Sequence, residues 1–195
     1  MWGVTALVAA LVVLILPSLW SSWQGGSHDA RMPVSATAGG SPGSGPAGPQ
    51  GVDLSSMTPR EAADRLFNRV MAALSAGNQG EVQSFLPMAI DAYRLVPNLD
   101  HDGLFHLSLL QQAGGDYPAA AASAQQVLES DPNHLLALYA AAEAAQAQGD
   151  AASARGHYQR ILNVFESENA RGLPEYTEHG SFLATIREAA REYIQ

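Results

Sequence analysis

The chain has 195 residues, with ten basic residues against nineteen acidic ones, a formal net charge of −9 and no cysteine. Without cysteine there is no disulfide, no zinc–thiolate site, no catalytic thiol and no lipid attached through cysteine. All ten basic residues are arginine, which excludes lysine Schiff bases and phosphate-loop lysines, and the acidic balance disfavours nucleic acid and anionic lipid as partners.

Residues 1–23 predict a membrane anchor. Trp2 to Trp20 contains no charged residue, and at about 1.5 Å per residue it spans just under the ~30 Å hydrocarbon core of a bilayer. Trp2, Trp20 and Trp23 lie at the ends of this run, where indoles favour the lipid–water boundary. A cleaved signal peptide is the alternative, but the run has no basic start, and the small residues Val34–Ala36 lie well downstream of it.

Residues 24–55 predict a disordered linker. Gly, Ser, Ala and Pro dominate this stretch, so it cannot bury enough apolar surface to offset its chain entropy. The alternative is a segment that folds on a partner. Arg31 beyond the anchor favours a cytoplasmic side for the following domain, yet long acidic domains are often carried across. We expect a single-pass cell-membrane protein with its domain on the periplasmic or extracytoplasmic side.

Residues 56–195 predict helices only. Thr58 to Glu61 has the pattern of a capping box with proline in the first turn, and a second helix is expected at about 81–95, where Pro87 predicts a kink or the true start. Asp116 and Asp150 are predicted helix caps. Further helices are expected at about 101–113, 117–130, 134–147 and 151–167, and one final helix at about 175–194.

The helical part repeats itself with a spacing of 34 residues. Gly115 recurs as Gly149, and Ala120 recurs as Ala154. This period is typical of helix–turn–helix units stacked into a superhelix. An ordinary bundle of alanine-rich helices is the alternative.

The two units, residues 101–134 and 135–168, resemble the tetratricopeptide repeat (TPR) family, in its membrane-anchored bacterial type. The family has a bulky residue, a small residue, a glycine and an alanine at fixed positions of each unit. In the first unit these are Leu104, Ser108, Gly115 and Ala120, and in the second they are Leu138, Ala142, Gly149 and Ala154. Proline ends the first unit at Pro132, but Glu166 stands where the second unit should have it. The resemblance implies an all-α, TPR-like α-solenoid of antiparallel helix pairs, with residues 58–97 as a degenerate unit and residues 175–194 as a capping helix.

In this family the first helix of each unit lines a concave protein-binding groove. Carried over by position, the groove residues are Asp102, Phe105, Leu109, Gln112, Leu136, Tyr139, Glu143 and Gln146. They include no cation, so the clamp that some members use for a terminal carboxylate is not expected. An apolar or basic segment of another protein is the expected ligand. Packing of Phe105 and Tyr139 between helices is the alternative.

No motif points to catalysis, a cofactor or a metal. The run from Asn98 to Gly103 looks like the start of a calcium loop, but Leu109 stands where that loop needs glutamate, and Asp100 is better explained as a helix cap. The six histidines include no pair at helical i, i+4 spacing, although a zinc site assembled across helices stays open. We therefore expect no enzyme, no cofactor and no metal.

The sequence predicts a scaffold or assembly factor tethered to the membrane through residues 2–20 and binding another protein through its TPR groove. Family analogy suggests a partner in a membrane or envelope complex, with a role in the biogenesis of envelope or cytochrome complexes. The alternative is a stoichiometric accessory subunit of a membrane protein complex, whose anchor helix makes specific contacts through its few small residues.

Overall fold

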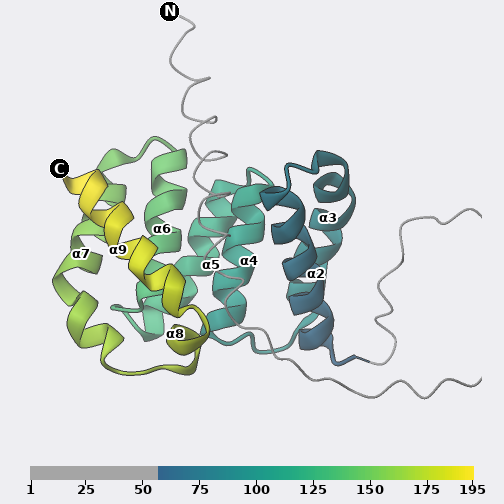
Figure 1. Cartoon of the computed structure of the whole chain (residues 1–195), viewed down its shortest axis with the longest axis horizontal. Coiled ribbons are helices and arrows are strands. Elements are labelled where there is room, and N and C mark those ends of the chain that lie inside the picture. The colour runs from purple at the N-terminus through teal and green to yellow at the C-terminus, as the bar shows by residue number, and fades with distance from the viewer. Residues whose placement is uncertain (1–56) are drawn as a thin grey trace, which may run out of the picture.

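The structure, a computed structural model, describes residues 57–195, and this range forms eight helices and no strand (Figure 1). The predicted all-helical class is therefore confirmed for the described residues. The expected anchor (1–23) and linker (24–55) lie outside them. Between residues 57 and 195, no helix is long and apolar enough to cross a bilayer.

The helices form three stacked hairpins and a C-terminal extension. The hairpins are α2 (Pro59–Ser75) with α3 (Gln79–Leu95), α4 (His101–Ala113) with α5 (Tyr117–Ser130), and α6 (Leu135–Ala147) with α7 (Ala151–Asn169); α8 (Pro174–Glu178) and α9 (Gly180–Ile194) follow. In the stack, α4 contacts α2 and α3, and α6 contacts α4 and α5. Helix α9 lies against α7 and α6, the place that the first helix of another unit would take (Figure 1).

Short-range side-chain caps begin the helices where the sequence predicts them. The Thr58 side chain accepts from the Glu61 N–H, and the Glu61 carboxylate accepts from the Thr58 N–H at 2.9 Å, which completes the capping box. The carboxylates of Asp100, Asp116 and Asp150 each accept from the backbone N–H three residues later, at 2.8, 3.2 and 3.0 Å. The predicted starts of α2, α4, α5 and α7 are confirmed.

The turns inside the two best repeats are equivalent. Gly115 and Gly149 both have φ of +78°, a conformation that residues with a side chain adopt only with strain. Helix α3 begins at Gln79 and continues through Pro87, so the proline does not mark its start.

The prediction of one final helix at 175–194 is wrong, because this segment forms two helices. The structure divides it into α8 and α9 at His179, whose φ of −102° and ψ of 23° end one helix and precede the next. The His179 side chain is buried, and its Nε2 donates to Asp102 Oδ1 at 2.7 Å. The break therefore lies where the chain turns a histidine toward the start of α4.

Small side chains stand where the paired helices meet. Ala120 and Ala154 are fully buried, as are Ser108 and Ala142. The Ser108 hydroxyl of α4 donates to the Ala120 carbonyl of α5 at 2.9 Å. The repeat pattern thus marks close helix–helix contacts in both units.

Ala120→Leu and Ala154→Leu should each lower the free energy of unfolding by about 1–3 kcal/mol, because added methylene groups overpack a filled contact. Urea denaturation followed by circular dichroism measures the loss. Ala122→Leu and Ala152→Leu, at exposed positions of the same helices, are the matched controls. Equal stability of the buried and exposed variants would contradict the register.

Candidate functional site

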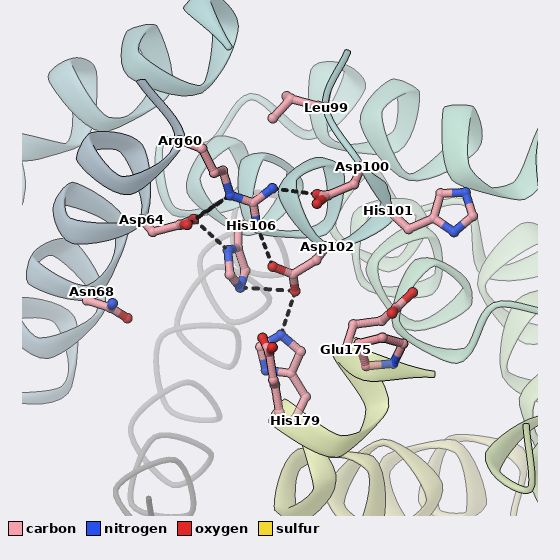
Figure 2. Close-up of a pocket in the computed structure, with 12 residues that line it drawn as sticks. Arg60, Asp64, Asn68, Leu99, Asp100, His101, Asp102, His106, Glu175 and His179 are labelled. Carbon is pink, nitrogen blue, oxygen red and sulfur yellow. Dashed lines mark hydrogen bonds and ion pairs between the residues drawn. The ribbon is translucent and has the colours of Figure 1, made fainter. Parts of the chain in front are cut away.

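A cavity of about 980 Å³ opens between α2, the start of α4 and α8 (Figure 2). We call it the α2–α4–α8 cavity. Five carboxylates, three histidines and one arginine are among the residues that line it. The excess of carboxylates makes it an acidic site, which favours cationic ligands.

Arg60 of α2 organises one wall of this cavity. Its Nε donates to Asp64 Oδ2 at 2.8 Å, its Nη2 donates to Asp102 Oδ2 at 2.6 Å, and its Nη1 bonds Asp100. One guanidinium thereby joins α2 to the start of α4, and charge-assisted bonds of this kind are the strong ones. The sequence did not predict this role, because Asp100 and Asp102 lie more than a helical hairpin away from Arg60 along the chain.

A hydrogen-bonded chain leads from Asp64 to His106. The Tyr93 hydroxyl donates to Asp64 Oδ1 at 2.5 Å, and His106 Nδ1 lies 2.9 Å from the same hydroxyl. Burial first, and then Asp64, raise the pKa of Tyr93 far above its ordinary value, so its proton stays on the hydroxyl. Because that proton goes to Asp64, His106 Nδ1 must be the donor to Tyr93.

Asp102 lies at the centre of the cavity wall. Burial alone would raise its pKa, but the hydrogen bond from His179 and the nearby His106 and Arg60 lower it to about 2. Asp102 is therefore a carboxylate at neutral pH. In Figure 2 its Oδ1 points toward His106 and His179, while its Oδ2 meets Arg60.

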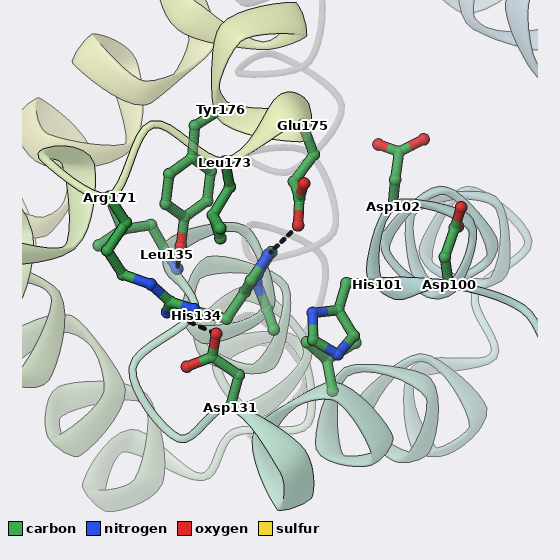
Figure 3. Close-up of polar contacts among 12 residues, drawn as sticks. Asp100, His101, Asp102, Asp131, His134, Leu135, Arg171, Leu173, Glu175 and Tyr176 are labelled. Atoms are coloured by element: carbon green, nitrogen blue, oxygen red, sulfur yellow. Dashed lines mark hydrogen bonds and ion pairs between the residues drawn. The ribbon is translucent and has the colours of Figure 1, made fainter.

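His134 caps the start of α6 and bonds Glu175, which lines the cavity (Figure 3). Its Nδ1 accepts from the Ala137 N–H at 3.4 Å, and its Nε2 donates to Glu175 Oε1 at 3.0 Å. Burial is the main reason that the pKa of His134 falls below its ordinary value, so the ring is neutral. The His101 ring stands edge-on to it, with centroids 5.2 Å apart.

A second polar network fastens α8 to the end of α7 (Figure 3). The Tyr176 hydroxyl accepts from the Leu135 N–H at 2.8 Å and donates to Glu168 at 3.0 Å. Arg171 donates to Asp131 at 2.6 Å and also bonds Glu168. Helix α8 is thus held by buried hydrogen bonds to the start of α6 and to the end of α7.

The structure buries the apolar members of the predicted groove. Phe105 and Leu136 have no exposed surface, and Tyr139 is 2% exposed. The rings of Phe105 and Tyr139 lie 6.0 and 5.3 Å from that of Phe182 in α9. The structure therefore has these two residues packed between helices, and Leu109 is buried too.

The polar members of the predicted groove make different contacts. Asp102 belongs to the α2–α4–α8 cavity, whereas Gln112 donates to the Ala140 carbonyl at 3.3 Å and so joins α4 to α6. Glu143 accepts from the Tyr158 hydroxyl of α7, and Gln146 is partly exposed on α6. Protein binding by the eight groove positions stays a prediction.

Glu143→Gln should make the protein more stable relative to wild type as the pH rises. Burial chiefly raises the pKa of Glu143 above its ordinary 4.5, despite the hydrogen bond from Tyr158. A raised pKa in the folded state means that the stability present below pH 4.5 is lost as pH rises through that raised pKa. Glutamine removes this loss and keeps an acceptor for Tyr158.

Urea denaturation at several pH values from 4 upward measures the effect, with the exposed Glu129→Gln as the matched control. A stability difference between Glu143→Gln and wild type that does not change with pH would contradict the assignment.

Comparisons with known proteins find a match to the two repeats. The family model described as "Tetratricopeptide repeat" matches residues 102–134 and 136–166. No curated protein matches the chain.

Two solved structures are similar to this chain. The PcrH structure from Pseudomonas aeruginosa is 17% identical, covers 71% of this chain and 98% of its own, and has a TM-score of 0.45. The Yersinia enterocolitica type III secretion translocator chaperone SycD is 19% identical, with coverages of 72% and 97% and a TM-score of 0.43. The family match covers two successive segments, which correspond to the second and third hairpins of the structure.

Proposed function

We propose that this protein is a membrane-tethered scaffold or assembly factor that holds another protein against its helical repeats. The observation that carries the proposal is the pair of tetratricopeptide repeats, stacked as regular hairpins beside an acidic cavity. Repeats stacked in one dimension create an extended surface, and this is how such proteins bind partners.

The negative charge of the α2–α4–α8 cavity and the burial of the apolar groove residues both favour a basic segment of the partner at this cavity. Helix α9 covers Phe105 and Tyr139, so the apolar strip is occupied by the chain itself. The cavity is open and carries five carboxylates. Complementary charge speeds encounter and suppresses wrong partners.

The apolar N-terminal run and the Gly/Pro-rich stretch support the tethering part of the proposal. An anchor at residues 2–20 would confine the repeats to a membrane surface, and the linker at 24–55 would set their reach. Tethering of this kind raises the effective concentration of a partner in the same membrane, into the millimolar range for short linkers. We propose a partner in a membrane or envelope complex and an extracytoplasmic location for the repeats.

Charge inversion at the cavity rim should weaken partner capture. Asn68 and Glu178 are exposed and line the cavity, so Asn68→Arg combined with Glu178→Arg should repel a basic segment. Co-purification in mild detergent identifies the partner, and titration of that purified partner should then show about tenfold weaker binding. Glu129→Arg, on an exposed position of α5, is the matched charge control. Equal binding by all three proteins, with unchanged helicity, would refute the cavity as the docking surface.

The tether makes a separate prediction. Scrambling residues 4–16 at constant hydrophobicity should leave capture of the same partner intact, because a tether needs only membrane affinity. Loss of the partner after scrambling, with the protein still in the membrane fraction, would instead favour an accessory subunit whose anchor makes specific contacts.

A further inference from the structure

We propose that Asp102, His106 and His179 form a binding site for a divalent transition-metal cation of the zinc class. One ligand atom from each residue lies within 4.8 Å of the other two. Two imidazoles and a carboxylate suit zinc, nickel, cobalt and similar ions. The chain has no cysteine, so nitrogen and oxygen are the only strong ligands that it can offer. This inference goes beyond the proposed protein-binding function.

The hydrogen bonds of His106 favour coordination through its Nε2 atom. His106 Nδ1 donates to Tyr93, whose hydroxyl donates to Asp64, so in the neutral ring Nε2 is the nitrogen that holds the lone pair. That Nε2 points at Asp102 Oδ1 from 3.5 Å. A lone pair and a carboxylate oxygen facing each other attract a shared cation. The Tyr93–Asp64 pair then supplies the outer hydrogen bond that ligating histidines commonly make.

The distances fit a small cation. Metal–ligand bonds of about 2.0–2.1 Å in tetrahedral geometry separate neighbouring ligand atoms by about 3.3 Å. The His106–Asp102 separation of 3.5 Å already matches. His179 Nε2 is 2.7 Å from Asp102 Oδ1, so this pair widens by about half an ångström when the metal binds. The Nε2 proton of His179 is lost to solvent on binding, and the neutral coordinated ring carries its proton on Nδ1.

The surroundings hold the ligands in place and admit an ion. Arg60 binds Asp102 Oδ2, which leaves Oδ1 directed at the two imidazoles. The His106 ring is stacked on Phe67 with centroids 4.0 Å apart. The side chains of His106 and His179 are 9% and 5% exposed, and both line the open cavity. The site therefore has a rigid ligand set, a net negative wall and a path from solvent.

A neighbouring trio, His101, His134 and Glu175, also lies within 4.8 Å but fits a metal less well. Both nitrogens of His134 are already engaged, since Nδ1 accepts from Ala137 at the start of α6 and Nε2 donates to Glu175. Coordination through Nε2 would place the proton on Nδ1, where it would face the Ala137 N–H and break the helix cap. This trio serves as the internal comparison for the proposed site.

The site joins distant parts of the chain. Asp102 and His106 belong to α4, whereas His179 stands at the break between α8 and α9. A bound cation would fasten the start of α9 to the second hairpin. Binding to the folded state alone stabilises it by mass action, so added metal should raise the unfolding temperature.

The first test uses the full chain, purified without a histidine tag and freed of metal. Titration with Zn²⁺ should show one saturable site by calorimetry. Long-range ¹H–¹⁵N spectra of the wild type should then show the ring nitrogens of His106 and His179 changing, with those of His101 and His134 unchanged. No saturable binding, or changes at His101 and His134 instead, would overturn the proposal without any mutation.

Variants give the second test. Asp102→Asn and His179→Gln should each weaken Zn²⁺ binding by at least about tenfold, the lower end of the loss seen when groups that support a metal site are changed. His101→Gln, in the same cavity, is the matched control and should bind as wild type does. Circular dichroism confirms that each variant is folded. Binding that survives in both Asp102→Asn and His179→Gln, or that His101→Gln abolishes, would refute the site.

Discussion

The close contact between the two helices of each repeat determines where everything else in this protein lies. Ser108 and Ala120 in the first unit, and Ala142 and Ala154 in the second, are small and fully buried. Because side chains of this size let the helices approach, each hairpin is narrow enough for the next to stack on it. The stack places the start of α4 beside α2 on one side and α8 on the other, and the acidic cavity forms at that meeting point.

Much of the fold could be predicted because its signals are local. Caps such as Asp116 and Asp150, and turns such as Gly115 and Gly149, depend on four or five consecutive residues, and the structure has them as expected. A period of 34 residues then suffices to predict stacked hairpins. The helix ends in this region consequently differ from the predicted ends by two residues or fewer.

The site could not be predicted because its contacts are not local. His179 reaches Asp102 across 77 residues, and Arg60 reaches the same carboxylate across 42. No spacing rule relates positions that far apart in different units. The break at His179 has both a local and a non-local side, since Gly180 is a poor helix former and the His179 side chain bonds Asp102 of α4. The family pattern likewise assigns Phe105 and Tyr139 to a groove, but it does not predict that Phe182 of α9 packs on both.

The position of α9 makes the chain its own competitor. A partner that binds the strip around Phe105 and Tyr139 must displace Phe182 first. Its apparent affinity is therefore its intrinsic affinity multiplied by the fraction of molecules in which α9 has detached. A fragment cut before α8 would lack that competitor. It would bind apolar peptides more tightly than the intact chain does. It would also expose an apolar surface to solvent and therefore self-associate.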